Sequence, residues 1–139
     1  MMNGAGDYLE KAQSSYEGAR ACLEKQAFDS CVSRSYYAVF QAAIAALIQL
    51  TDFRPARGEW SHKATQAEFN RRLVMRRKVF SGQIGKTLLT LIEWRHRADY
   101  SPTNTGRQMA RASTSLAEVF LTSIHNQLGE SHGPKSKPS

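Results

Sequence analysis

The sequence has few signals for β-strands. Runs of Val, Ile and Thr are rare, no Asn-Gly hairpin is present, and only four of the 139 residues are proline. Alanine, leucine, glutamine and arginine, which favour helices, are frequent instead. The length suits one domain with a single core. These features predict an all-α protein.

Cysteine is scarce, and no secretion or membrane segment stands out. Cys22 and Cys31 do not form a Cys-x-x-Cys motif, and we interpret them as small core residues in a reduced compartment. The N-terminal segment lacks a basic region followed by an apolar run, so it does not resemble a secretion signal. The apolar run at 36–50 is short and is interrupted by polar residues such as Gln41, which argues against a membrane span. We therefore predict a cytoplasmic protein with no membrane contact.

Negative charge is also in short supply. The sequence has 12 Asp and Glu against 19 Lys and Arg, a net charge of +7. This balance either serves solubility alone or indicates an acidic partner such as RNA. The strongest cluster, here called the basic run, is either a solvated helix face or a surface that contacts phosphates without sequence preference. It consists of Arg71, Arg72, Arg76, Arg77 and Lys78.

Motifs for metal ions, cofactors and nucleophiles are missing. The four histidines, His62, His96, His125 and His132, are far apart and share no metal-ligand spacing. No glycine-rich phosphate loop is present, and no nucleophile motif surrounds the serines. We expect no metal ion and no cofactor.

Apolar residues instead recur at steps of three and four, the period of a helix. We expect Asp7 to cap the first helix, and Phe69 and Leu73 to point inward from the third, which ends near 81–82. Residues 1–128 should form one antiparallel bundle of four to five helices, followed by a disordered tail at 129–139. The expected helices cover about 7–26, 29–50, from Ser61 or Thr65 onward, 83–99 and 104–128.

The second expected helix is apolar on nearly every side. Its core stripe contains Tyr36, Val39, Phe40, Ala43, Leu47 and Leu50, and its opposite side contains Arg34, Tyr37, Gln41, Ile44, Ala45 and Ile48. Either the bundle encloses this helix or a second subunit covers the far side. We favour a homodimer, because four or five helices rarely enclose one of their number. Ile44, Ala45 and Ile48 would then lie at the subunit interface.

The apolar stripe of the fourth helix continues into Arg95 and Asp99. An arginine held against a core needs a carboxylate or a bound anion, and Asp99 lies one turn away. We expect Arg34, Tyr37, Gln41, Arg95 and Asp99 to gather around one cleft between the second and fourth helices, closed by the dimer mate. There the arginines either hold Asp99 or receive a phosphate.

Two segments of the sequence resemble the HEPN domain family of small prokaryotic helical bundles. They are SRSYYAVFQAA at 33–43 and EWRHRADY at 93–100. The family branch reads Arg-x-Tyr-Tyr-Ala-x-Phe in the second helix and Arg-x-x-Ala-Asp-Tyr in the fourth, with a histidine between them that His62 matches. The resemblance covers about residues 5–128. The matching residues are Arg34, Tyr36, Tyr37, Ala38, Phe40, Ala42, Ala43, Arg95, Ala98, Asp99 and Tyr100.

The resemblance implies a dimer-forming bundle with one of two functions. One is a metal-independent ribonuclease. The other is a non-catalytic partner of a small nucleotidyltransferase, often within a toxin–antitoxin pair. Ribonucleases of the family carry Arg-x4-6-His at the dimer cleft, where arginine stabilises the phosphorane charge and histidine moves a proton to or from the 2′-hydroxyl.

The sequence departs from the ribonuclease pattern. Tyr100 stands five residues after Arg95, where the family has histidine, and a tyrosine pKa of about 10 makes a poor base at neutral pH. Gln41 replaces a histidine that many relatives carry in the second helix. We therefore predict a binding module that pairs with a nucleotidyltransferase or another partner and contacts RNA. The alternative is RNA cleavage by Arg95 with Tyr100 or His62.

Overall fold

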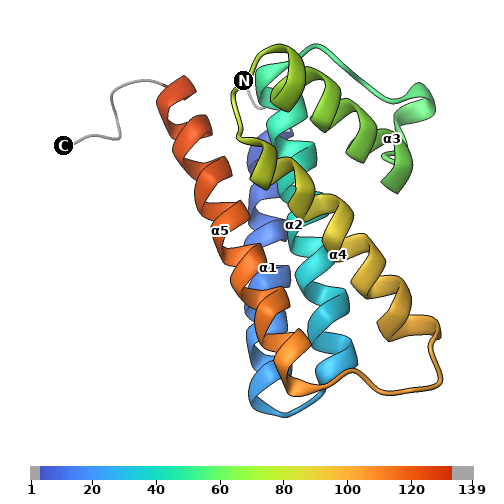
Figure 1. Ribbon diagram of the computed structural model, residues 1–139. Helices are drawn as coiled ribbons and strands as arrows, with labels where there is room; N and C mark the ends of the chain where they lie inside the picture. The colour runs from blue at the N-terminus through green and yellow to red at the C-terminus, as the bar shows by residue number, and fades with distance from the viewer. Residues whose placement is uncertain (1–3, 133–139) are drawn as a thin grey trace.

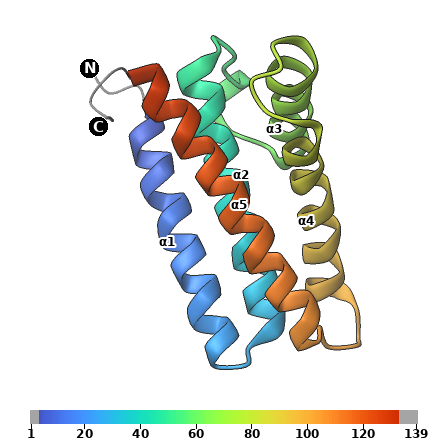
Figure 2. The same ribbon diagram turned by 60° about the vertical axis from the view of Figure 1, so that its left-hand side comes forward.

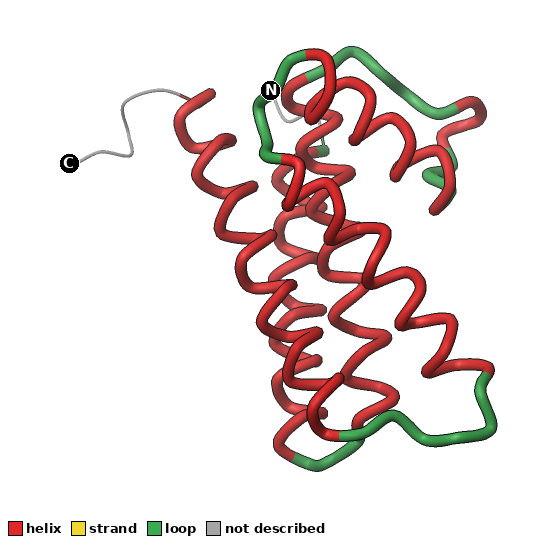
Figure 3. Tube along the Cα trace, viewed as in Figure 1, coloured by secondary structure: helices red, strands yellow, loops and turns green. Residues whose placement is uncertain are grey.

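A computed structural model describes residues 4–132, with side chains described as far as residue 129. Within this range the chain forms helices and no strand, which confirms the predicted all-α class (Figures 1 and 3). The helices are α1 (Ala5–Glu24), α2 (Phe28–Leu50), η1 (Ala56–Gly58), α3 (His62–Glu68), η2 (Phe69–Arg76), α4 (Gly82–Tyr100) and α5 (Arg107–His132).

The helix α2 is the central element of the bundle. It contacts α1, α4, α5, α3 and η2. His62, the first residue of α3, lies against Tyr36, Tyr37 and Phe40 in the middle of α2. Figures 1 and 2 show the four long helices side by side, with α3 lying beside the end of the bundle where α2 finishes. The connections at 51–61 and 101–106 contain Pro55, Gly58, Pro102 and Gly106, residues that do not favour the continuation of a helix.

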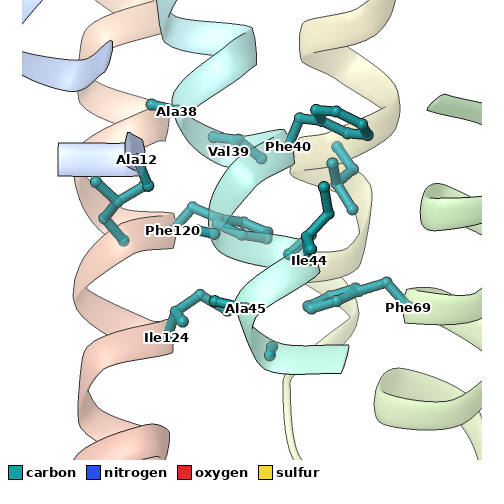
Figure 4. Packing of buried hydrophobic residues seen from close by; sticks show 14 of the residues in the cluster. Ala12, Ala38, Val39, Phe40, Ile44, Ala45, Phe69, Phe120 and Ile124 are labelled. Carbon is teal, nitrogen blue, oxygen red and sulfur yellow. The ribbon is translucent and has the colours of Figure 1, made fainter. Parts of the chain in front are cut away.

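Small residues on α2 allow its neighbours to approach closely. Five of its alanines have no exposed surface, namely Ala38, Ala42, Ala43, Ala45 and Ala46. Larger side chains from other helices fill the remaining space, including Phe120 of α5 and Phe69 of η2 (Figure 4). Phe69 and Leu73 are fully buried, as predicted. Burial of such side chains is the main favourable contribution to folding.

The structure contradicts the reasoning that placed α2 at a subunit interface. Ile44, Ala45 and Ile48 are 1%, 0% and 6% exposed within a single chain. The expectation that they form a dimer contact is wrong, because α1, α4 and α5 together with α3 and η2 enclose α2. The homodimer stays a prediction, without this support.

By length and composition, α2 qualifies as a candidate membrane span. An 18-residue window of it has a mean hydropathy of 1.3, but 78% of that window is buried inside the fold. A core helix of a folded bundle shows the same combination, because it must be apolar on all sides. The expected absence of membrane contact and the cytoplasmic location stay predictions.

Several helix ends differ from those expected. Gly4, not Asp7, precedes α1, and Asp7 lies in the first turn. Of the two expected starts for α3, the structure uses Ser61, whose hydroxyl accepts a hydrogen bond from Ala64 N at 3.0 Å. The helix α5 continues to His132, so the expected boundary at 128 falls inside it. The rest of the expected tail, 133–139, lies outside the described residues.

The segment η2 is π-helical, which the sequence analysis did not predict. It packs closely against α4, where Gly85 is buried. A Cβ atom at Gly85 would lie 3.1 Å from Val74 Cγ2 and even closer to Asn70 Oδ1. The absence of a side chain at Gly85 therefore permits this contact.

Cys31 is a core residue, as predicted. It is fully buried, and its thiol donates to Ala110 O over 3.6 Å. Burial raises the pKa of the Cys31 thiol to about 11, so the thiolate is strongly disfavoured at neutral pH. Cys22 is half-buried.

Candidate functional site

Three helices bring a cation, a histidine and aromatic rings together in what we call the Arg95 cluster. Its members are Tyr36, Tyr37 and Phe40 of α2, His62 of α3 and Arg95 of α4. Tyr36 and Tyr37 are neighbours on one turn of α2, and Phe40 lies one turn later. His62 is the first residue of α3, so the cap at Ser61 fixes where its side chain enters the cluster.

Arg95 is held mainly by groups of its own chain. Its Nη1 atom donates to Tyr37 Oη and to Asp99 Oδ2, both over 3.3 Å. Its guanidinium carbon lies 5.4 Å from the centre of the Tyr36 ring and 5.6 Å from that of Tyr37. The side chain is 15% exposed. A planar guanidinium suits such stacking, which adds to the ion pair.

One atom of Arg95 lacks a partner. Its Nε is buried and has no hydrogen-bond acceptor among the described residues. The predicted local pair with Asp99 therefore forms, but it does not use every donor of the guanidinium.

His62 is fixed by α2. Its Nδ1 lies 2.6 Å from Tyr36 Oη, and its ring centre lies 4.6 Å from that of Phe40. Burial, and then the charge of Arg95, lower the pKa of His62. Burial raises the pKa of the Tyr36 phenol. The hydrogen bond thus joins a protonated phenol and a neutral imidazole.

The structure separates Arg95 from one of its two candidate catalytic partners. Tyr100 is 72% exposed, and its ring packs 5.2 Å from that of His96. Five residues along a helix correspond to a rotation of about 140°, so Tyr100 does not share the face of Arg95. His62 lies beside Arg95 instead. Only the family resemblance pointed to His62, because its position depends on the path of the connection at 51–61.

The single cleft expected from the sequence is divided in two. Arg34, Tyr37 and Gln41 line a pocket between α1 and α2, whereas Arg95 and Asp99 lie outside it. Arg34 and Gln41 face α1, and Arg95 approaches α2 from α4, which separates them. Tyr37 connects the two places, because it lines the pocket and its hydroxyl accepts from Arg95.

Gln41 joins α1 to α2. Its side-chain amide lies 2.8 Å from Ser15 Oγ. With the nitrogen facing the acceptors, it also donates to Lys11 O over 3.0 Å and to Tyr37 O over 3.2 Å. This amide, which replaces the family's histidine, is therefore satisfied within the chain.

Acidic residues neutralise part of the basic run. Glu68 pairs with both Arg71 and Arg72 over 2.7 Å, and Asp52 lies 3.3 Å from Arg72. The two arginines lower the pKa of Glu68 by hydrogen bonding and charge. Glu68 precedes Arg71 and Arg72 by three and four residues, a spacing that predicts ion pairs on a helix. These two pairs were not among the predictions from the sequence.

The remainder of the basic run divides further. Arg77 donates to Leu50 O, one of the last carbonyls of α2, a structural role at a helix C-terminus. Arg76 and Lys78 are exposed and have no partner among the described residues. A pocket of about 440 Å³ that Arg72, Arg76 and Arg77 help to line also contains Asp52. An anion entering it would compete with this carboxylate.

The described part of the chain contains no group of three His, Cys, Asp or Glu residues that would hold a metal ion. The chemistry available in the Arg95 cluster is accordingly that of an arginine, a neutral imidazole and two phenols.

Comparison with known proteins agrees with the fold and the motifs. The UPF0332 protein glr0978 of Gloeobacter violaceus is 29% identical over 112 residues, which are 81% of this chain and 84% of that protein. The HEPN domain model matches residues 5–127, a span from the first residue of α1 nearly to the end of α5. The chain therefore belongs to the HEPN domain family.

Proposed function

We propose that this HEPN domain is a binding module that works with a second protein, a small nucleotidyltransferase, as one half of a toxin–antitoxin-type pair. The observation that carries the proposal is the state of Arg95. Its charge is engaged by Asp99, Tyr37 and two ring faces. An arginine that stabilises a phosphorane must instead direct its donors at the reacting phosphate.

The histidine of the Arg95 cluster supports the same proposal. One nitrogen of His62 is already hydrogen-bonded to Tyr36, and the ring is covered by Phe40. Tyr100, at the position where the family's ribonucleases carry histidine, does not contact Arg95 in the described structure. The polar groups of the cluster thus stabilise the junction of α2, α3 and α4.

The test has two parts. The purified protein is incubated with mixed RNA in the presence of a chelator, and we expect no cleavage. The protein is then co-expressed with a nucleotidyltransferase encoded beside its gene, and we expect a complex that survives gel filtration. Chelator-resistant cleavage that disappears in Arg95→Ala, or a nucleotidyltransferase that elutes separately, contradicts the proposal.

The second candidate function is a metal-independent ribonuclease, and the position of His62 favours it. A neutral imidazole close to an arginine with an unpartnered buried Nε provides both a base and a cation. In this mechanism His62 donates its Nδ1–H to Tyr36 Oη, which leaves Nε2 without a hydrogen, and Nε2 rather than Tyr100 exchanges the proton. RNA cleavage that is lost in His62→Gln and retained in Tyr100→Phe is the result expected of this candidate.

We further propose that the basic run contacts RNA through Arg76 and Lys78, since acidic or carbonyl groups engage the other three members. We expect Arg76→Glu to weaken RNA binding and to reduce the slope of log K against log salt by about 1. Arg71→Glu serves as the comparison variant, and it should also break the ion pair between Arg71 and Glu68. Wild-type protein that binds no RNA at low salt excludes this role.

A further inference from the structure

The pocket between α1 and α2, here called the Arg34 pocket, is rich in hydrogen-bond donors and has no carboxylate. Its volume is about 420 Å³, and it is lined by Ser15, Ser30, Ser33, Arg34, Tyr37 and Gln41. On α2 the members at 30, 33 and 34, 37 and 41 recur at steps of three and four, so they share one side of the helix. Figure 2 shows α1 and α2, the helices that form the pocket, running side by side.

The cation of this pocket is unpaired. The Arg34 guanidinium has no hydrogen-bond or ion-pair partner in the described part of the chain, unlike Arg95 with Asp99 or Arg72 with Glu68. An arginine carries five N–H donors in a planar arrangement that fits two oxygens of one anion. Arg34 therefore offers an unused binding group.

Gly18 of α1 leaves the space in which Arg34 lies. A Cβ atom at Gly18 would come within 2.9 Å of Arg34 Nη1 and 3.3 Å of Arg34 Cδ. The residue is exposed, but its guanidinium rests against the backbone of α1 at the pocket. This placement reduces the freedom that the side chain would lose on binding a ligand.

Hydroxyl groups supply further donors. Those of Ser30 and Ser33 have no partner among the described residues. The hydroxyl oxygen of Tyr37 accepts from Arg95, so its hydrogen is available to another acceptor. Ser30 lies in the first turn of α2, where the helix dipole favours an anion. The pocket thus offers a free guanidinium and free hydroxyl donors with no carboxylate among its lining residues, and a phosphate group would accept from these donors.

We propose that the Arg34 pocket binds a phosphate group, with Arg34 as the charged ligand and Ser30, Ser33 and Tyr37 as hydroxyl donors. This site is separate from the nucleotidyltransferase contact proposed above and does not rest on it. The phosphate of a small nucleotide and a phosphodiester within RNA present the same oxygens to these donors. The experiment therefore includes both sources.

The test measures binding by calorimetry near neutral pH and at low salt. The ligands are inorganic phosphate, AMP and a single-stranded RNA of about 12 nucleotides without a terminal phosphate. We expect Arg34→Gln to raise the dissociation constant about tenfold or more, because a charge-assisted hydrogen bond is lost. Arg34→Lys should lose less, since it keeps the charge but not the planar fork.

Two further variants separate a built site from general charge. Arg111→Gln removes one exposed positive charge from α5, outside the pocket, and should leave binding unchanged. Gly18→Leu keeps every charge but fills the space beneath Arg34, and should weaken binding as Arg34→Gln does. Circular dichroism checks that each variant is folded.

Binding of phosphate and AMP that depends on Arg34 supports a small-nucleotide ligand. Binding of the RNA alone with the same dependence supports a phosphodiester ligand. The proposal is overturned when none of the three ligands binds. It is equally overturned when Arg34→Gln and Arg111→Gln weaken binding by the same factor.

Discussion

Arg95 shows how one side chain combines several modest interactions. It joins an ion pair with Asp99, a hydrogen bond to Tyr37 and stacking on two rings. Each interaction would be weak on a solvated surface, but here the arginine is mostly buried. The side chain therefore serves first as a connector between α2 and α4.

Replacing Arg95 tests this role. We expect Arg95→Ala to lower the free energy of unfolding by about 1–3 kcal/mol, because stacking is lost and Asp99 is left unpaired. Urea denaturation measures the change, and Arg97→Ala, an exposed arginine on the same helix, is the control. A variant that keeps full stability but loses an RNA-cleaving activity would instead favour the ribonuclease function.

His62 makes stability depend on pH. Its pKa is lowered in the fold, first by burial and then by Arg95, whereas in the unfolded chain it stays at about 6.5. Below about pH 6.5 the unfolded chain binds more protons than the folded chain does, so the free energy of unfolding decreases as pH falls. Above that pH the contribution of His62 to stability is fully present. We expect the melting temperature of the wild type to decrease from pH 7 to pH 5.

The control for this pH dependence uses glutamine. In His62→Gln the decrease between the two pH values should be smaller, since the group that resists protonation is gone. In His125→Gln, where the histidine is exposed on α5, it should be unchanged. Equal pH profiles for wild type and His62→Gln would show that another group carries the effect.

At the scale of elements, α4 and η2 approach each other closely at Gly85. Gly85→Ala should lower stability by about 1–3 kcal/mol, because the new Cβ overpacks against Val74 and Asn70. Gly82→Ala, in the same helix but with open space around it, should be neutral or stabilising. Thermal melts of both variants measure the difference. Similar melting temperatures would mean that η2 shifts to accommodate the new Cβ atom without a loss of stability.

The enclosure of α2 changes the expected effect of a charge at Ile48. This side chain is 6% exposed, and its Cδ1 would lie 3.7 Å from a Cβ atom placed on Gly4. We expect Ile48→Glu to be severely destabilised, by more than about 3 kcal/mol, because it buries a carboxylate without a partner. Circular dichroism and light scattering distinguish this from the folded monomer that an interface position would give.

The sequence predicted the bounds of the first two helices better than it predicted which elements pack around them. The bounds of α1 and α2 were predicted to within two residues, because Gly, Pro and polar residues interrupt the helical period around them. The π-helical form of η2 leaves no mark in that period. The apolar pattern of α2 indicated full burial, but a pattern on one helix does not identify what covers it.

In the candidate site, too, local pairs were predicted from the sequence and contacts between helices were not. The pair Arg95–Asp99 is local and was predicted from its spacing. The contact between Tyr36 and His62 joins residues on two helices, so it depends on tertiary packing that spacing does not reveal. The separation of Arg34 from Arg95 was not predicted either, because it depends on which helix packs against each side of α2.

At the scale of the whole molecule, the homodimer that the family resemblance implies must use an outer face, since α2 is enclosed. Val119 of α5 is 60% exposed and lies beside Ile84 in a shallow hollow between α4 and α5. An exposed apolar group of this kind suits a protein contact. We expect wild-type dimers in light scattering and monomers for Val119→Glu. A wild type that is monomeric at micromolar concentration excludes the homodimer.

The central place of α2 also has a consequence for the chain during its synthesis. The helix is complete at Leu50, but the α5 residues that cover it, from Ala117 to Leu128, are translated much later. At about 5–20 residues per second, the ribosome needs several seconds to add them. Throughout this interval the face of α2 that α5 covers in the finished fold stays exposed in the nascent chain. We therefore expect a newly made α2 to be bound by chaperones that recognise apolar segments, until α5 arrives and closes the bundle.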